Sequence, residues 1–171
     1  MGNKGIVMSE NNETIQYLTF KLGDELFGVD VSKAREVLDY SEVTHVPQMP
    51  GYMLGVINLR GSVVPVINLR KKFGMADSEQ TIDTCIIVIE IEIDGDIIVV
   101  GTMVDAVQEV LDLTEAQIEP PPRLGTKLNT EFIKGMGNIE DQFLIILDID
   151  RVFTAEELSV LEGQEKEVIA E

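Results

Sequence analysis

The chain carries a second, diverged copy of its own first half. Matching residues recur 73 positions further along the chain, and from residue 52 onward the spacing becomes 80. At the first spacing, the matched pairs are Gly28 with Gly101, Val31 with Val104, Ala34 with Val107, Glu36 with Glu109, Val37 with Val110, Leu38 with Leu111, Glu42 with Glu115 and Pro47 with Pro120. At the second spacing, they are Tyr52 with Phe132, Gly55 with Gly135, Asn58 with Asn138, Leu59 with Ile139, Asn68 with Asp148, Leu69 with Ile149 and Phe73 with Phe153. We therefore expect two copies of one small unit, with a seven-residue insertion between Pro120 and Phe132; two copies are too few for a solenoid.

The repeat divides the 171 residues into two units, one expected over residues 15–77 and the other over residues 83–162. Residues 1–14 are expected to form a flexible tail and residues 163–171 a loose one, with a polar linker near residues 77–83. Units of roughly 60–70 residues are only marginally stable alone, so the two should share apolar surface. Exchange of terminal strands between them stays open.

Short apolar runs dominate both units. They are rich in β-branched residues and are bounded by glycine, proline or aspartate, with hairpin signals at Gly23–Asp24 and at residues 94–96. Thr154 and Glu157 have capping-box spacing, and apolar residues follow at helical spacing, which predicts a C-terminal helix over residues 150–161. The pattern predicts a mainly β protein built from small barrels or sandwiches.

The net charge of −18 comes from 31 acidic and 13 basic side chains. So acidic a protein is not expected to bind nucleic acid or anionic membrane surfaces, because like charges would be brought together. Two interpretations stay open: a solvated surface, or a complement to a basic partner. No apolar run reaches the roughly 18–20 residues of a membrane helix, so we expect no membrane insertion.

The side chains needed for catalysis or metal binding are scarce. The chain has one histidine, His45, and one cysteine, Cys85, and both are expected to be structural because no catalytic partner stands near either in the sequence. Zinc-ligand spacing, a calcium loop, a Walker motif and a dinucleotide fingerprint are all missing. We expect a non-enzyme that needs no metal or cofactor. The single cysteine cannot form an internal disulfide, which suits a reducing cytoplasm.

Differences between the copies point to a candidate interaction site. Asn58–Leu59–Arg60–Gly61 corresponds to Asn138–Ile139–Glu140–Asp141, so the turn keeps its frame, the arginine becomes acidic and the glycine loses its freedom at positive φ. Arg60 is either an interface residue or an ordinary surface arginine paired with Glu36. A second feature is a set of small apolar residues at matching positions of the two copies. They form either a groove for a partner helix or simply core: Val31, Ala34, Val37, Val104 and Val107.

Several motifs together resemble the CheW family of bacterial chemotaxis coupling proteins. They are GD-x-x-FGVDV, AREVL, VTHVP, GVINLRG, VVPVINL, VDAVQEVLDLT and LIILDID, and the resemblance covers roughly residues 15–161. The resemblance implies two five-stranded SH3-like β-barrels packed around a shared hydrophobic core, with short helices and a C-terminal helix. It implies a cytoplasmic adaptor that couples chemoreceptor tips to the regulatory domain of the histidine kinase CheA in membrane-associated arrays.

Carried over by position, the resemblance also implies site residues. It places a receptor-binding groove on Leu18, Val31, Ala34, Val37, Val104 and Val107, and a partner-binding or assembly site on Glu36, Gly55, Asn58, Arg60 and Gly61. We then expect Val104→Asp to abolish receptor binding without unfolding the protein. The alternative is a two-barrel module that binds a small ligand or peptide between its barrels and has no kinase partner. A carboxylate-based hydrolase is a more distant alternative.

Overall fold

The fold, seen in a computed structural model, is mainly β, as predicted. The structure describes residues 14–40, 43–45, 47, 51–93, 95–120, 132–153 and 157. The first copy contains β1 (Thr14–Leu22), β2 (Glu25–Asp30), η1 (Val31–Lys33), β3 (Ala34–Asp39), β4 (Met53–Leu59), β5 (Ser62–Asn68) and α2 (Leu69–Lys72). The second contains β6 (Cys85–Ile93), β7 (Asp96–Val104), β8 (Ala106–Thr114), η2 (Glu115–Gln117), β9 (Ile118–Glu119), β10 (Ile133–Ile139), β11 (Gln142–Leu147) and α3 (Ile149–Val152).

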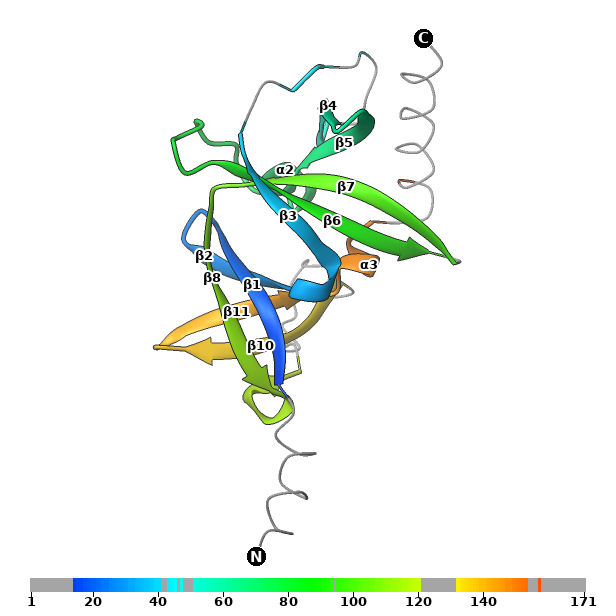
Figure 1. The fold of residues 1–171 in the computed structure, drawn as a ribbon. Coiled ribbons are helices and arrows are strands. Elements are labelled where there is room, and N and C mark those ends of the chain that lie inside the picture. Colours follow the sequence, from blue (N-terminus) through cyan, green and yellow to red (C-terminus); the bar gives the residue numbers. More distant parts are fainter. Residues whose placement is uncertain are drawn as a thin grey trace, which may run out of the picture.

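The two sheets do not follow the two copies along the chain. One has six strands in the order β8-β1-β2-β11-β10-β9, and the other has five in the order β3-β6-β7-β5-β4. Each sheet therefore combines a central hairpin from one copy with flanking strands from the other. The β1–β2 hairpin of the first copy lies among strands of the second, and the β6–β7 hairpin of the second copy lies among strands of the first. Figure 1 shows the blue β1–β2 hairpin beside β10 and β11, away from β4 and β5.

The sequence repeat is nevertheless an exact match to the strand order. The equivalent strands are β1 and β6, β2 and β7, β3 and β8, β4 and β10, and β5 and β11. Exchanging the two members of each pair converts the five-stranded sheet into the six-stranded one without β9. The parallel pairings agree residue by residue, since Val66 lies opposite Gly101 and its counterpart Ile146 lies opposite Gly28. The fold thus has pseudo-two-fold symmetry with exchanged hairpins. The division of the chain into subdomains at residues 77–83 describes the repeat but cuts across both sheets, and it stays a prediction.

Three apolar clusters hold the two sheets together. The largest draws residues from both sheets, including Phe20 and Val29 from the six-stranded sheet and Ile87 and Val104 from the five-stranded one. Each sheet also has a smaller cluster of its own on its other face. Because side chains alternate along a strand, Ile87, Ile89 and Ile91 of β6 enter the shared cluster, while Ile86 and Val88 enter the local one. This arrangement matches the predicted shared core.

The hairpin signals in the sequence are confirmed. Leu22 pairs with Glu25 across Gly23, and Ile93 pairs with Asp96 in the longer β6–β7 hairpin. The expectation that both copies keep the same turn frame at this hairpin is confirmed, although aspartate replaces glycine in the second copy. Arg60 and Gly61 have φ of 51° and 86°, and Glu140 and Asp141 have φ of 46° and 69°. Both turns keep the left-handed pair typical of a two-residue type I′ hairpin, a conformation that aspartate tolerates better than most residues.

Some expected elements are short or lie elsewhere. In the described part of the apolar run at residues 43–47, Thr44 forms an isolated bridge with Val56. Most of the helix expected over residues 150–161 lies outside the described residues, as do most of the N-terminal tail and the tail at residues 163–171. Of the predicted C-terminal helix, the structure describes the turn α3 and residue 157.

Candidate functional site

The six residues expected to form a receptor-binding groove will be called the seam: Leu18, Val31, Ala34, Val37, Val104 and Val107. They come from both copies, and the structure places all but one of them in or against the shared core. Leu18 and Val104 belong to the core cluster, with exposed fractions of 7% and 0%. Val31, Ala34 and Val107 are half-buried and pack against it. Val37 is 44% exposed.

The burial of Val104 changes one expectation made from the sequence. A charge placed at a fully buried position has no water and no partner, so the substitution should damage the fold. The expectation that Val104→Asp leaves the fold intact is therefore wrong. The assignment of the seam to receptor binding stays a prediction, with Val37 as the member that solvent reaches most easily.

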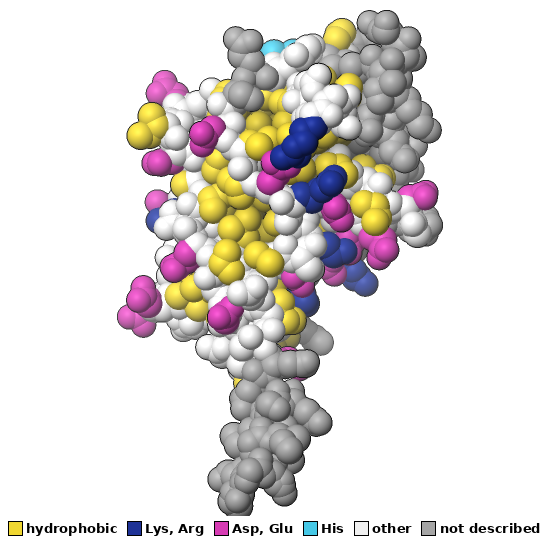
Figure 2. Space-filling model, viewed as in Figure 1, with side chains coloured by type: hydrophobic (Ala, Val, Ile, Leu, Met, Phe, Trp, Pro, Cys, Tyr) yellow, Lys and Arg dark blue, Asp and Glu magenta, His cyan; other side chains and the backbone are white. Residues whose placement is uncertain are grey.

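Val110 is a further exposed apolar residue that the sequence analysis did not assign to the seam. It lies directly opposite Leu18 in the antiparallel β1–β8 pair, so both side chains project from the same face of the sheet. Its side chain is 46% exposed, close to the value for Val37. The signal was present in the sequence, because Val110 is the repeat counterpart of Val37. Figure 2 shows hydrophobic side chains gathered in the middle of the face on which β3, β1 and β8 lie, with acidic side chains around them.

Arg60 and Glu36 form the ion pair considered from the sequence. Nη1 of Arg60 donates to Oε2 of Glu36 at 2.7 Å, and Nη2 donates to Oε1 at 2.8 Å. The hydrogen bonds from Arg60 lower the pKa of Glu36 below its ordinary value. The pair joins β3 and the β4–β5 turn, which lie at opposite edges of the five-stranded sheet. The pairing is confirmed, and a role for it in assembly stays a prediction.

Gly61, Asn58 and Gly55 have structural tasks around this turn. The amide of Gly61 donates to Oδ1 of Asn58 at 2.9 Å, which fixes the turn. A Cβ on Gly55 would overlap the carbonyl oxygen of Thr44, because the segment at residues 43–45 crosses β4 closely there. Its counterpart Gly135 meets Ile118 of β9 in the same way, with a Cβ only 2.5 Å from Cγ2. Partner binding by these residues stays a prediction.

Gly55→Ala should therefore destabilise the protein. The new methyl group would force Thr44 away from Val56 and break the two backbone hydrogen bonds between them, at 2.9 and 2.8 Å. At roughly 1 kcal/mol for each hydrogen bond, we expect a loss of about 2 kcal/mol in the free energy of unfolding. Urea denaturation checks this. Gly51→Ala is the control, because nothing lies within 4 Å of a Cβ at that position. Equal stability of the two variants would contradict this account of Gly55.

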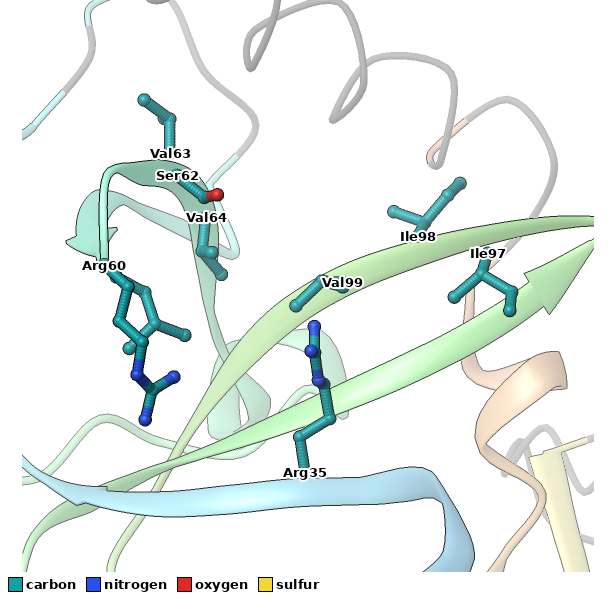
Figure 3. Close-up of a pocket in the computed structure, with 9 residues that line it drawn as sticks. Arg35, Arg60, Ser62, Val63, Val64, Ile97, Ile98 and Val99 are labelled. Atoms are coloured by element: carbon teal, nitrogen blue, oxygen red, sulfur yellow. The ribbon is translucent and has the colours of Figure 1, made fainter.

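A shallow cleft of about 310 Å³ lies beside the Arg60 turn. It will be called the basic cleft, because Arg35 and Arg60 are the charged residues that line it, among apolar side chains of β5 and β7 such as Val63, Ile97 and Val99. Figure 3 shows Arg60 entering from the β4–β5 turn, while Arg35 rises from β3 toward Val99. The side chains of Arg35 and Arg60 are 50% and 71% exposed, although each has an acidic partner.

A second polar cluster was not found from the sequence. Arg70 of α2 donates from Nε to Oδ1 of Asp105 at 2.9 Å and from Nη2 to Oδ2, and its Nη1 donates to the carbonyl oxygen of Ala76 at 2.7 Å. Oδ2 of Asp105 also accepts the amide of Gly23 at 2.7 Å. The hydrogen bonds from Arg70 lower the pKa of Asp105. Asp105 joins β7 of one sheet to β8 of the other, so this cluster pins the chain where it crosses between the sheets.

The residues weighed for catalysis have structural surroundings. Nδ1 of the exposed His45 lies 2.8 Å from the carbonyl oxygen of Leu54. Cys85 is buried in the shared core, and burial raises the pKa of its thiol, which disfavours the reactive thiolate. Among the described residues, no group of three or more histidine, cysteine, aspartate or glutamate side chains could hold a metal ion. No helix in the described part of the chain is long and apolar enough to cross a membrane.

Comparisons with known proteins agree with this architecture. A family model described as a CheW-like domain matches residues 16–157. The chemotaxis protein CheW of Klebsiella aerogenes is 36% identical over 151 residues, which are 88% of this chain and 89% of that protein. The chemotaxis protein CheW of Treponema pallidum is 30% identical, over 93% of this chain and 94% of that protein.

A solved structure gives the same result. The crystal structure of the scaffolding protein TtCheW from Thermoanaerobacter tengcongensis matches with a TM-score of 0.74 and 35% sequence identity, over 84% of this chain and 95% of that one. These relatives are named as chemotaxis and scaffolding proteins rather than as enzymes, in agreement with the prediction of a non-enzyme. On the match over residues 16–157 and relatives at 30–36% identity, the chain belongs to the CheW family of bacterial chemotaxis coupling proteins.

Proposed function

We propose that this chemotaxis scaffold couples chemoreceptor cytoplasmic tips to the regulatory domain of the histidine kinase CheA. In this proposal, the seam binds the receptor, and the region around Arg60 contributes to assembly with the kinase. The protein is then cytoplasmic and is recruited to membrane-associated receptor arrays through these partners. The observation that carries the proposal is the exposed apolar surface at Val37 and Val110, which the repeat places at matching positions on β3 and β8.

The seam suits the apolar face of a helix. Val37 and Val110 are 44% and 46% exposed, on strands that each pair with only one neighbour in the two sheets. Ala34 and Val107, which are half-buried, continue the apolar surface toward the shared core. An amphipathic helix presents side chains three and four residues apart, which is the spacing that such a surface can accept. Burial of the exposed valines then supplies binding energy at about 25 cal/mol per Å² of apolar area.

A bridge between two partners does not need tight binding at either site. Once one partner is bound, the second binding event is effectively intramolecular, so modest affinities suffice for an ordered assembly.

The alternative of a ligand held between the two halves has less support. The shared cluster packs between the sheets, and three of its members in β6, namely Ile87, Ile89 and Ile91, are at most 1% exposed.

The receptor arm of the proposal is tested by placing a charge on the exposed part of the seam. We expect Val37→Asp and Val110→Asp each to weaken binding of a receptor-tip fragment by about tenfold or more, because aspartate must lose its water in the interface. Ile82→Asp is the matched control, since Ile82 is 98% exposed and lies in the linker. Fluorescence anisotropy with a labelled fragment gives the affinities. Binding that is unchanged in both seam variants would refute the assignment of the seam.

A further inference from the structure

The linker at residues 77–83 connects the two halves of the fold, of which the first runs from β1 to α2 and the second from β6 onward. All seven of its residues are exposed, and Figure 1 shows it as a green loop that projects beside α2. Each end is anchored on its own side. Nδ2 of Asn68 donates to Oδ1 of Asp77, and the amide of Thr81 donates to Oγ1 of Thr84, both at 2.9 Å. The linker can therefore be opened between Asp77 and Thr81 without releasing either anchor.

The strand pairings make the two halves depend on each other. Four pairings join a strand of the first half to a strand of the second: β1 with β8, β2 with β11, β3 with β6 and β5 with β7. Taken alone, the first half lacks the hairpin between β3 and β5, and the second half lacks the hairpin between β8 and β11. The seam is shared in the same way, with Val37 on the first half and Val104 on the second.

Side-chain contacts also cross between the halves. The hydroxyl of Thr19, which is 1% exposed, donates to the carbonyl oxygen of Glu109 at 2.7 Å and accepts the amide of Glu109 at 3.1 Å. Four ion pairs join a basic residue of the first half to an acidic residue of the second: Lys33 with Asp150, Arg35 with Glu90, Arg70 with Asp105 and Lys72 with Glu157. Nζ of Lys72 also lies over the rings of Tyr52 and Phe153, one from each half, at 5.5 and 5.6 Å from their centroids.

The charge of the chain is divided unequally between the halves. Residues 14–77 carry seven basic and seven acidic side chains, whereas residues 83–162 carry four basic and eighteen acidic ones. Two second halves would therefore repel each other, while a first half supplies the basic members of all four ion pairs between the halves. Although the repeat makes the two hairpins alike in shape, charge favours the pairing of a first half with a second half.

We propose that the two halves are specific binding partners of each other, so that the chain is a hairpin-exchanged heterodimer tied by an expendable linker. Exchange of equivalent elements is the pattern of a domain-swapped dimer. The intact linker keeps each half at a high effective concentration near the other, and after a cut the same contacts must hold the halves together at the concentration of the solution. The proposal does not depend on the kinase or receptor roles.

A cut in the linker of the full-length chain tests the pairing. A recognition sequence for a site-specific protease is inserted after Glu79, and the protein is cleaved once it has folded. We expect the two fragments to elute together from a sizing column, at the position of the uncut protein and with its far-ultraviolet circular dichroism. The midpoint of urea denaturation should fall on dilution of the cut protein and stay constant for the uncut one, because only the cut halves separate when they unfold.

Two substitutions in the cut protein separate pairing of the halves from the stability of either half. Arg70→Met removes an ion pair between the halves and should weaken their association by about a hundredfold. Lys71→Met is the matched control, because Lys71 pairs with Asp77 on its own side of the cut, and it should leave the association unchanged. The proposal is overturned if the insertion abolishes folding, if the fragments separate on cleavage, if dilution leaves the midpoint of the cut protein unchanged, or if the two substitutions act equally.

Discussion

Val104→Asp is expected to prevent the chain from folding stably. Val104 ends β7 opposite Cys85, is 0% exposed and belongs to the cluster shared by both sheets. An aspartate there must either bury an unpaired charge or be protonated and still leave polar oxygens without partners, in addition to the lost packing of the valine. We expect a loss of at least about 4 kcal/mol, which is comparable to the whole stability of a small domain.

The matched control is Val110→Asp, on the strand that follows. Because Val110 is 46% exposed, its substitution should change the free energy of unfolding by less than about 1 kcal/mol. Far-ultraviolet circular dichroism and urea denaturation of both variants make the comparison. If Val104→Asp were as stable as Val110→Asp, the two sheets would not share the core described above.

Arg70→Met should be the second most damaging change. It would leave Asp105, whose side chain is 28% exposed, without the guanidinium that donates to both of its oxygens, and it would free the carbonyl oxygen of Ala76. Removing one partner of a largely buried ion pair usually costs 3–5 kcal/mol, and partial exposure puts our expectation at about 3 kcal/mol. The double variant Arg70→Met with Asp105→Leu should recover part of this loss, because no charge is then left without a partner.

The same pair gives a pH dependence with a definite sign. Since Arg70 lowers the pKa of Asp105, the folded state holds this carboxylate ionised more strongly than the unfolded state does. Its contribution to stability is complete above the unfolded pKa of about 3.9 and is lost as the pH falls through the lower folded value. In urea titrations, the stability gap between the wild type and Asp105→Asn should stay constant above about pH 5 and shrink below about pH 4. A gap that widens in acid would contradict this sign.

The sequence predicts the units of the fold well and their connection poorly. The repeat and the alternating apolar runs indicate β hairpins and a shared core, and both are present. The exchange of β1–β2 with β6–β7 could not be deduced, because each hairpin is apolar on both faces and could pair within its own copy equally well. The sequence left open whether the seam forms a groove or core, and it could not say which members are buried, since Val104 and its counterpart Val31 look alike in the sequence, yet only Val104 is fully buried.

Some residues of the candidate site could likewise be predicted from the sequence, and others could not. The pairing of Arg60 with Glu36 was one of two interpretations that the sequence offered, because the copies differ in charge at that turn. Arg70 and Asp105 are 35 positions apart and meet only because the chain crosses between the sheets at Asp105. No local pattern marks that crossing. Val110 could have been found, since the repeat assigns it the position of Val37.

The measurement that bears most directly on the coupling role is calorimetric titration of the intact chain with two partners from the same organism. One is the regulatory domain of the kinase, and the other is a receptor-tip fragment. The account predicts that each partner binds alone and that a chain saturated with one still binds the other. Absence of binding to both by the folded protein would contradict the proposed function, and competition between the two partners would contradict the bridge.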